Sequence, residues 1–485
     1  MGTRTKDDAA STPWHAREWD LVIMGAGTTG LSAAAFAGLR HGRVLLVEAS
    51  PDLGGSLLVA HGQISAAGTK LQKQKGIHDT PEMHYEEALR ISKGTIDHDL
   101  ARLAIFNAAE SFDWLCDNGY DVIPECPSLS NAHEPYSVPR YYWGKDWGRS
   151  IARVLVAKVQ EQVAQGTVTL QLNTRVVGLE QDARGAVTGI ETEEEGGVRR
   201  KVRTRNLLLA SGGYAANPAM FERMVGVPLY ARAAYRFNQG AGIDLGVAAG
   251  GFVRGRDKYL SNFGWLLQDD EFPSPIIGRV NTYPNERPVW EIYVNSNARR
   301  FIREDEPSVD QREHTLLRQP NLRYWVVFDQ AIFDQAPPMV YGWTREQMAA
   351  AFNTQFPFTR ADSLEDLARA IGIDPAGLAA TVAGYNAGRA SGEDYFGREH
   401  MPAPIAQAPF YAIRQQGASV TSTAGIAVDG SLRVIRKDRS PVPGLYAAGE
   451  ILGSGQLQGD AFVGGMMAMP CLVFGRMLGE KLIPL

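Results

Sequence analysis

The sequence has few cysteines and lacks a hydrophobic run long enough to span a membrane. Cys116, Cys126 and Cys471 are its only cysteines, and no pair has CxxC spacing, so we expect free thiols in a reducing, cytoplasmic setting. No stretch approaches the ~18 uninterrupted apolar residues of a transmembrane helix. Residues 1–17 lack the apolar core of a secretory signal and predict a flexible tail. We therefore expect a cytoplasmic protein without a membrane span.

An excess of positive charge is also missing. The 49 Lys and Arg residues are outnumbered by 54 Asp and Glu, which gives a formal net charge of −5. Nucleic acids and anionic membranes require a basic face, so neither is expected as a main partner. The 485 residues suggest two or three domains of about 100–200 residues each. The composition leaves the oligomeric state open.

A strand–turn–helix–strand unit opens the chain. Asp20–Met24 predicts a buried strand, GAGTTG and an Ala-rich helix follow, and a second strand ends at Glu48. In such a unit Gly25 permits the tight turn, Gly27 lets a pyrophosphate approach and Gly30 lets the helix pack on the strand. The helix N-terminus attracts phosphate, and Glu48 can accept hydrogen bonds from ribose hydroxyls. An ordinary tight turn is the alternative, and the unit alone does not separate FAD from NAD.

The remaining sequence predicts an interrupted nucleotide domain. Short strands with the parallel-sheet pattern occur on both sides of an aromatic- and proline-rich middle section. Helical patterns are found at 82–120, 149–165, 344–352 and 363–389. We expect an α/β fold with a Rossmann-type domain built from both chain ends and an inserted α+β capping domain. The expected divisions are 1–17 (tail), 18–256 (nucleotide domain, first part), 257–403 (capping and substrate domain) and 404–485 (nucleotide domain, second part).

Segments along nearly the whole chain carry a family resemblance. In order they are GAGTTGLSAA, DLGGS, AAGTKLQKQKGIHDTPE, LLLASGGYAANPAM, QGAGIDLGVAAGG, VNSNARRFIRED, VPGLYAAGE and GGMMAMPCLVFGRMLG. Together they resemble the FAD-dependent fumarate reductase/succinate dehydrogenase flavoprotein superfamily, which includes the 3-ketosteroid dehydrogenases. The resemblance implies FAD as the cofactor.

The resemblance also implies how FAD is held. Ser56 stands where succinate dehydrogenases carry their flavin-linked histidine, so we expect non-covalent FAD, with His61 as an alternative attachment point. The backbone of Val177 would bond the adenine, and Glu450 would meet the ribityl chain. A helix starting near Met466 would point its positive end at flavin N1/O2. The expected FAD contacts are Gly25, Ala26, Gly27, Thr28, Thr29, Gly30, Glu48, Ala49, Gly54, Gly55, Ser56, Ala67, Gly68, Thr69, Val177, Ala210, Ser211, Gly212, Gly449, Glu450, Gly465 and Met466.

Two departures from the family pattern concern the substrate. Dicarboxylate-binding members use cationic side chains to hold two carboxylates. Thr421 takes the place of their substrate histidine, and Phe462 takes the place of their late arginine. We therefore expect an apolar substrate, steroid-like or aromatic, contacted by Thr421, Phe462 and Gly464. This places the chain closer to the 3-ketosteroid dehydrogenase-like branch than to the dicarboxylate reductases.

Proton transfer has two sets of candidates. Arg300 and Glu304 match the family's proton-delivering arginine and its carboxylate partner, although a structural salt bridge explains the pair equally well. Tyr411 lies near where the family places a carbonyl-binding tyrosine, and Tyr141 or Tyr142 is a candidate base. A phenol acts in this way only if its pKa of ~10 is lowered, and packing is the alternative role for each tyrosine.

These observations predict an FAD-dependent oxidoreductase acting on CH–CH bonds. Hydride would move between flavin N5 and a carbon next to a carbonyl, in dehydrogenation of a ketone or reduction of an enone. The expected partners are a small-molecule substrate and an external electron acceptor or donor. The alternatives are a flavin-containing hydratase or isomerase, a fumarate-reductase-like reductase of an unsaturated acid, a protein that holds FAD without turnover, and an NAD-linked dehydrogenase.

Overall fold

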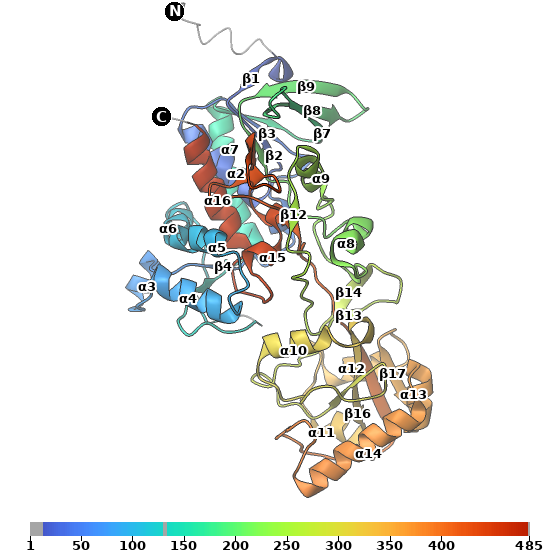
Figure 1. Cartoon of the computed structure of the whole chain (residues 1–485). Coiled ribbons are helices and arrows are strands. Elements are labelled where there is room, and N and C mark those ends of the chain that lie inside the picture. The colour runs from blue at the N-terminus through green and yellow to red at the C-terminus, as the bar shows by residue number, and fades with distance from the viewer. Residues whose placement is uncertain (1–12, 130–132, 484–485) are drawn as a thin grey trace, which may run out of the picture.

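The computed structural model describes residues 13–129 and 133–483, and these form two lobes (Figure 1). A six-stranded sheet lies at the centre of one lobe and a four-stranded sheet at the centre of the other. Of the tail predicted at 1–17, residues 1–12 lie outside the described residues. The rest includes the short helix η1 (Trp14–Ala16), where the carbonyl of Trp14 accepts a hydrogen bond from Trp19 Nε1 at 3.0 Å. No helix within the described ranges is long and apolar enough to cross a membrane.

The six-stranded sheet contains strands from both ends of the chain, as predicted. Its strand order is β20-β21-β10-β2-β3-β6, and only the edge strand β20 runs antiparallel to its neighbour. Every side chain of β2 and β3 is buried, as expected for parallel strands covered on both faces. The strands are β2 (Leu21–Met24), β3 (Val44–Val47), β6 (Val168–Gln171), β10 (Leu207–Leu209), β20 (Arg433–Ile435) and β21 (Pro441–Ala447).

Three helices lie side by side against this sheet: α2 (Thr28–Leu39), α7 (Gly148–Ala164) and α16 (Ala468–Leu482) (Figure 1). The C-terminal helix α16 packs closely on α2 because two glycines face it. A Cβ at Gly475 would lie 2.4 Å from the carbonyl oxygen of Thr29, and one at Gly479 would lie 2.5 Å from that of Ala33. The last helix of the chain therefore supports the helix of the opening βαβ unit.

The remaining elements of this lobe surround the central sheet. A second sheet has the order β1-β9-β8-β7, and β4 pairs with β5. The helical region predicted at 82–120 is divided into α4, α5 and α6, with capping residues at each break. The bounds are β1 (Glu18–Trp19), β4 (Ile64–Ser65), α3 (Lys70–Gln74), α4 (Pro81–Ile91), α5 (His98–Phe106), α6 (Ala108–Asp117), β5 (Tyr141–Tyr142), β7 (Thr174–Gln181), β8 (Val187–Glu194), β9 (Arg199–Thr204), α8 (Pro218–Val225), α9 (Ala241–Ala248) and α15 (Ser454–Leu457).

The other lobe is the cap. Its antiparallel sheet has the order β15-β16-β18-β17 and is packed with aromatic side chains. Phe410–Gln416, which the sequence assigns to the nucleotide domain, forms β18 inside this sheet, so the chain leaves the cap later than residue 403. Gly372 takes a left-handed conformation (φ 73°) and divides the helical region predicted at 363–389. The bounds are β15 (Ile292–Asn295), α10 (Val309–Leu316), β16 (Arg323–Asp329), α11 (Gln330–Gln335), α12 (Arg345–Ala351), β17 (Phe358–Ala361), α13 (Leu364–Ile371), α14 (Pro375–Ser391) and β18 (Phe410–Gln416).

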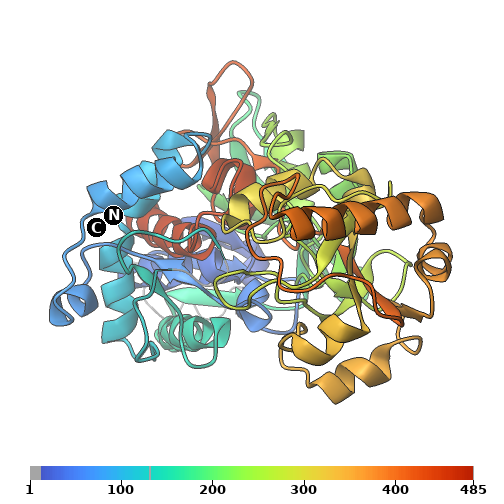
Figure 2. The same ribbon diagram turned by 90° about the horizontal axis from the view of Figure 1, so that it is seen from below.

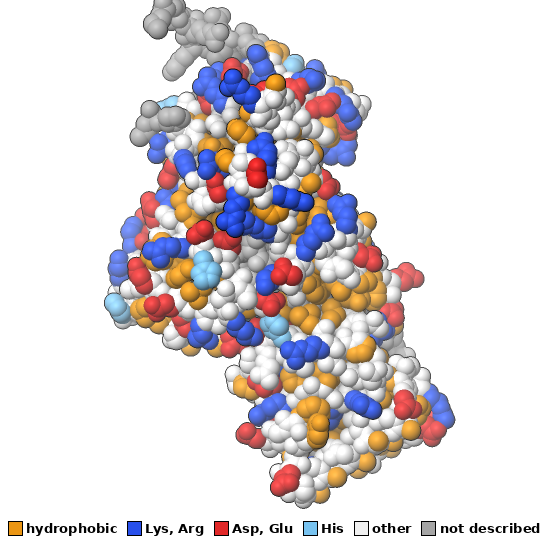
Figure 3. All heavy atoms as spheres, viewed as in Figure 1, with side chains coloured by type: hydrophobic (Ala, Val, Ile, Leu, Met, Phe, Trp, Pro, Cys, Tyr) orange, Lys and Arg blue, Asp and Glu red, His pale blue; other side chains and the backbone are white. Residues whose placement is uncertain are grey.

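Two small sheets connect the lobes. Strand β12 (Val253–Arg254) pairs with β19 (Gly425–Ile426), where the chain enters and leaves the cap. Strands β11 (Ala231–Arg232), β13 (Leu266–Leu267) and β14 (Ser274–Gly278) form the second sheet. Seen from below, the yellow and orange cap lies beside the nucleotide lobe (Figure 2). Hydrophobic side chains gather on the surface over β13 and β14, between the lobes (Figure 3).

Candidate functional site

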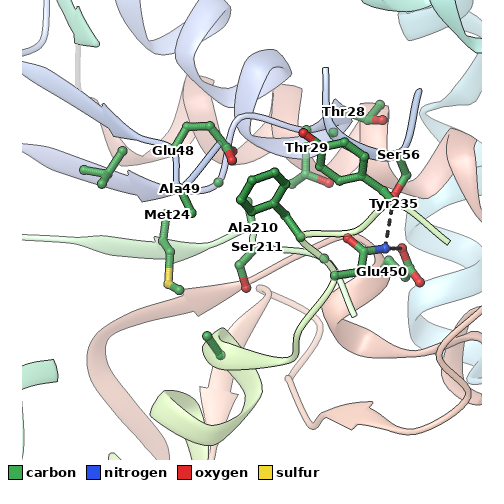
Figure 4. A pocket seen from close by; sticks show the side chains of 18 of the residues that line it. Met24, Thr28, Thr29, Glu48, Ala49, Ser56, Ala210, Ser211, Tyr235 and Glu450 are labelled. Carbon is green, nitrogen blue, oxygen red and sulfur yellow. Dashed lines mark hydrogen bonds between the residues drawn. The ribbon is translucent and has the colours of Figure 1, made fainter. Parts of the chain in front are cut away.

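A pocket lies at the ends of β2, β3 and β10, where α2 begins (Figure 4). The space inside it, including its open mouth, is about 850 Å³. Twelve of the expected FAD contacts line it: Gly25, Gly27, Thr28, Thr29, Glu48, Ala49, Gly55, Ser56, Ala210, Ser211, Gly212 and Glu450. Sequence positions more than 400 residues apart thus meet in one cavity.

The loop between β2 and α2 has the geometry expected of a dinucleotide site. Gly25 has φ 103°, and a Cβ there would lie 2.6 Å from the carbonyl oxygen of Ala210. At Gly27 no atom lies within 4 Å of the Cβ position, so the backbone is open to a ligand. Glu48 accepts hydrogen bonds from the backbone N–H groups of Ala26 (2.6 Å) and Ser50 (2.8 Å). The carboxylate therefore fixes the loop while it faces the pocket.

A side chain that the sequence did not single out joins three parts of the pocket. Asn238 Nδ2 donates to Ser56 Oγ at 3.1 Å and to Glu450 Oε2 at 3.2 Å (dashed in Figure 4). Glu450 Oε1 accepts from the backbone and hydroxyl of Ser422. Burial raises the pKa of Glu450, and the bonds from Ser422 and Asn238 oppose that shift. The one clue to Asn238 in the sequence is its position two residues before Gly240-Ala241-Gly242, where α9 begins.

Other pocket residues were also missed, and they come from loops, from β7 and from α16. Tyr235 projects into the cavity in Figure 4, and Phe237 and Cys471 line it as well. Burial raises the pKa of the Cys471 thiol to about 12, so the thiol stays protonated. Val176 lines the pocket, whereas Val177 falls at a register shift between Val176 and Gly178 that leaves it out of the pairing with β8. That position suits the backbone contact with adenine expected of Val177.

The other expected FAD contacts lie outside the pocket lining. Gly30, Ala26 and Gly54 support the first turn, where Gly54 N–H donates to the carbonyl of Ala26 at 2.9 Å. Thr69 begins α3 as its N-cap. Gly465 has φ 79°, and a Cβ there would lie 2.3 Å from Ser65 N, so the segment before α16 packs against β4. The remaining ones are Ala67, Gly68, Val177, Gly449 and Met466.

The paired tyrosines of β5 are held by neutral hydrogen bonds. Tyr142 Oη lies 2.9 Å from Thr69 Oγ1, and Tyr141 Oη donates to Gln63 Oε1 at 2.9 Å. Burial raises the pKa of both phenols, the opposite of what a base requires. Tyr136, from the preceding loop, donates to the carbonyl of Gly464 at 2.6 Å. These tyrosines support the backbone before α16.

Arg300 and Glu304 form an ion pair inside the cap. Arg300 Nε and Nη2 lie 2.7 and 2.6 Å from the oxygens of Glu304, and Nη1 donates to Asp394. Arg398 Nη1 also bonds Glu304, at 3.1 Å. Burial lowers the pKa of Arg300, but the bonds to Glu304 and Asp394 outweigh it and raise the pKa overall. The group joins β15 to the loop after α14.

Tyr411 lies in the aromatic core of the cap, away from the pocket residues described above. Its ring stacks on Phe328 and Phe333, with centroids 5.2 Å from each. Its hydroxyl donates to Gln330 Oε1 at 2.5 Å. Burial raises its pKa. The structure therefore places Tyr411 and Arg300 in the cap, and Tyr141 and Tyr142 in the other lobe.

The two residues that replace cationic ligands each contact an uncharged side chain. Thr421 Oγ1 lies 3.2 Å from Ser419 Oγ, and the next residue, Ser422, bonds Glu450. Phe462 stacks on His133, with ring centroids 3.4 Å apart and planes 18° from parallel. Thr421 therefore lies in the segment that reaches Glu450 in the pocket. Phe462 lies two residues before Gly464.

The pocket geometry agrees with a comparison against protein families. A family model described as "FAD binding domain" matches residues 20–460. The chain belongs to the FAD binding domain family. The pocket fits that cofactor, because the backbone at Gly27 is open toward the space it would occupy and Glu48 and Glu450 line the same space.

Similar proteins in this family act on carbon–carbon bonds. A probable fumarate reductase, Ifc3, from Shewanella frigidimarina is 27% identical over 471 residues, which are 95% of this chain and 74% of the relative. A 4-oxocyclohexanecarboxylate 2-dehydrogenase from Sinomonas cyclohexanicum is 23% identical over 548 residues, 96% of this chain and 92% of the relative. The crystal structure of a 3-ketosteroid delta1-dehydrogenase from Sterolibacterium denitrificans has a TM-score of 0.74 at 19% identity, covering 96% and 99%. This last likeness shows the shared fold.

These findings confirm the predicted fold class, cofactor and enzyme class. The protein is an FAD-dependent oxidoreductase of the FAD binding domain family, and the relatives it resembles include fumarate reductases.

Proposed function

We propose that this enzyme oxidises or reduces a carbon–carbon bond beside a carbonyl group in a flat, apolar substrate. The observation that carries the proposal is the stack of Phe462 on His133 next to Gly464. A dicarboxylate site places a guanidinium at that position, whereas here an aromatic face is presented. Thr421 adds a neutral hydroxyl that can bond a carbonyl oxygen. The cap and the nucleotide lobe meet here, as is common for small-molecule sites.

The residues of the pocket would hold FAD without a covalent bond. Glu48 would bind the adenosine ribose, the N-terminus of α2 the pyrophosphate, and Glu450 and Ser56 the region nearer the flavin. When bound, FAD supplies the capacity to accept or donate hydride. Because Ser56 offers a hydroxyl that already accepts a bond from Asn238, acid denaturation should release all flavin into the supernatant. Flavin that remained in the protein pellet would contradict this part of the proposal.

We propose that Arg300 and Glu304 brace the cap. The bidentate pair is reinforced by Asp394 and Arg398, and the pKa of Arg300 is raised, which makes loss of its proton harder. The alternative roles of Tyr141, Tyr142 and Tyr411 as acid or base are opposed by their raised pKa values. A substrate of the kind named in the Sinomonas relative, a ring ketone, fits the proposed chemistry because its carbonyl activates the adjacent carbon–carbon bond.

Anaerobic titration of the chemically reduced, FAD-loaded protein tests the proposed function. Benzylideneacetone, an aryl enone, is expected to restore the oxidised flavin spectrum and to yield the saturated ketone by mass spectrometry. A water adduct without any flavin change would favour a hydratase instead. If neither flavin nor enone changes, and oxidised protein is not bleached by the saturated ketone, the proposal is contradicted.

A further inference from the structure

Arg279 is held between two tyrosine rings on the cap. The backbone brings them together, because Tyr341 N–H donates to the carbonyl of Arg279 at 3.1 Å and Val280 pairs with Val340. The Arg279 guanidinium carbon lies 4.7 Å from the ring centroid of Tyr283 and 5.0 Å from that of Tyr341. Contacts at such distances stabilise the cation through the negative faces of the rings.

The stack continues beyond Tyr283 into the cap. The guanidinium carbon of Arg312 lies 4.6 Å from the Tyr283 centroid and 5.4 Å from that of Phe263. Arg312 is fully buried and donates to the carbonyl of Thr282. At the outer end, the hydroxyl of Tyr341 donates to Glu286. Arg279 is therefore held by rings that are themselves fixed, and its orientation is set before any ligand arrives.

Among the described residues, Arg279 has no paired anion, unlike Arg300 and Arg398 in the same lobe. Within residues 13–129 and 133–483, no carboxylate lies within ion-pair distance of Arg279, and no acceptor is hydrogen-bonded to its guanidinium. Arg300 and Arg398, by contrast, bind carboxylates. The side chain is only partly buried. Because aromatic rings lie against the guanidinium, its edge, which carries the N–H donors, is the part that can bind a ligand.

The nucleotide-lobe residues near Arg279 are neutral. Burial and the charge of Arg279 both lower the pKa of His61, and the same causes lower the pKa of His133 to about 3. These two histidines are therefore uncharged at neutral pH. His133 is the residue that stacks on Phe462. Arg279 is thus the partly exposed positive charge beside these neutral rings, whereas Arg312 is fully buried against Tyr283.

We propose, on the basis of the function proposed above, that Arg279 binds a carboxylate of the substrate while the conjugated part lies against Phe462. A guanidinium binds a planar carboxylate through two parallel N–H bonds. Two carboxylates would need a second accessible cation, but the neighbouring histidines are neutral and Arg312 is fully buried. The substrate class is therefore a monocarboxylate with a flat, unsaturated body, or its saturated counterpart.

Paired probes test the assignment. The FAD-loaded protein is titrated with trans-cinnamate and with benzylideneacetone, which have the same aryl-alkene body but differ in charge, and binding is followed by the flavin spectrum. In Arg279→Gln, the Kd for cinnamate should rise at least about tenfold while that for benzylideneacetone changes less than about twofold. Arg279→Lys keeps a positive charge but loses the two parallel N–H donors of the guanidinium. Its Kd for cinnamate should therefore lie between those of Arg279→Gln and the wild type.

The matched control is Arg369→Gln on α13. Arg369 is exposed, and its carboxylate partners Glu365 and Asp366 lie on its own helix, so the same change of charge should leave both Kd values at those of the wild type. An equal effect of Arg279→Gln on both probes, or no effect on either, overturns the assignment. If wild-type protein exchanges electrons with neither probe, the proposed function fails. If it reduces benzylideneacetone but binds no cinnamate, only the role of Arg279 fails.

Discussion

Asn238 shows how one side chain can organise a cofactor pocket. It donates to Ser56 from the loop after β3 and to Glu450 from the segment after β21. Glu450 is wholly buried, and its carboxylate depends on such donors because burial disfavours its charge. The relative positions of three distant segments are therefore coupled through one amide group.

Replacing Asn238 with Ala should weaken FAD binding about tenfold, because removing one partner leaves a buried acceptor at a cost of about 1–3 kcal/mol. Asn238→Asp should be weaker still, since a second carboxylate would face Glu450. Quenching of flavin fluorescence on binding measures the Kd. Unchanged affinity in both variants would show that the bonds of Asn238 do not shape the FAD site.

Arg300 gives a second test at the residue scale. Arg300→Met should destabilise the cap by about 3–5 kcal/mol, because Asp394 would lose its buried partner. Urea unfolding of the FAD-loaded protein measures the loss. Arg303→Met is the control: this neighbour is partly exposed and pairs with Asp305 and the exposed Glu399, so the cost should stay under ~1 kcal/mol. Lost turnover with unchanged stability would favour a proton relay instead.

The residues that could be predicted from sequence share one property: their roles are local. Gly25, Gly27, Gly30 and Glu48 lie within one βαβ unit, where spacing along the chain fixes spacing in space. Asn238 could not be found in this way, because its partners are 182 and 212 residues away. The tyrosine candidates were identified by residue type, and type alone does not show that burial raises a phenol's pKa.

At the scale of elements, helix periodicity predicted that a helix exists more accurately than it predicted where the helix begins and ends. The helix expected at 149–165 is α7 (Gly148–Ala164). The pattern at 363–389 continues across Gly372 and Pro375, where the backbone turns and a new helix is capped by Asp374. Strand β18 was assigned to the wrong lobe because a strand's sequence does not record which sheet it pairs with.

The contact of α16 with α2 is testable at this scale. In Gly475→Ala the new Cβ would meet the carbonyl oxygen of Thr29 at 2.4 Å, and such overpacking costs about 1–3 kcal/mol. Because α2 begins at the dinucleotide loop, we expect a lower urea midpoint together with weaker FAD binding. The matched control is Gly384→Ala in α14, where no atom lies within 4 Å of the Cβ position. That variant should gain up to about 1 kcal/mol from helix propensity.

An increase in stability for both variants would show that the two helices separate without cost. A loss for both would indicate a general intolerance of helical glycines to substitution. Only the contrast between Gly475 and Gly384 assigns the effect to the contact with α2.

At the scale of the whole molecule, the two lobes also meet through charged side chains on α10. Lys93, in the loop after α4, lies 2.5 Å from Asp310 of the cap. His314 lies 3.3 Å from Asp310 and 3.8 Å from Asp460 of the nucleotide lobe. Glu313 is the other titratable group nearby, and burial raises its pKa to about 8. This contact between the lobes therefore depends on groups that titrate near neutral pH or above it.

The pKa shift of His314 determines whether this contact stabilises the protein more at low or at high pH. The hydrogen bond to Asp310 raises its pKa to about 9, above the ordinary value of 6.5. A group whose pKa is raised on folding contributes stability that is complete below its unfolded pKa and is lost as pH rises through the folded value. The urea midpoint of the wild type should therefore exceed that of His314→Asn most at about pH 6, and the difference should disappear above about pH 10. His400→Asn is the control, because burial lowers the pKa of His400, the opposite direction to the shift of His314. A constant difference between wild type and His314→Asn from pH 6 to 10 would show that the histidine's charge does not hold the lobes together.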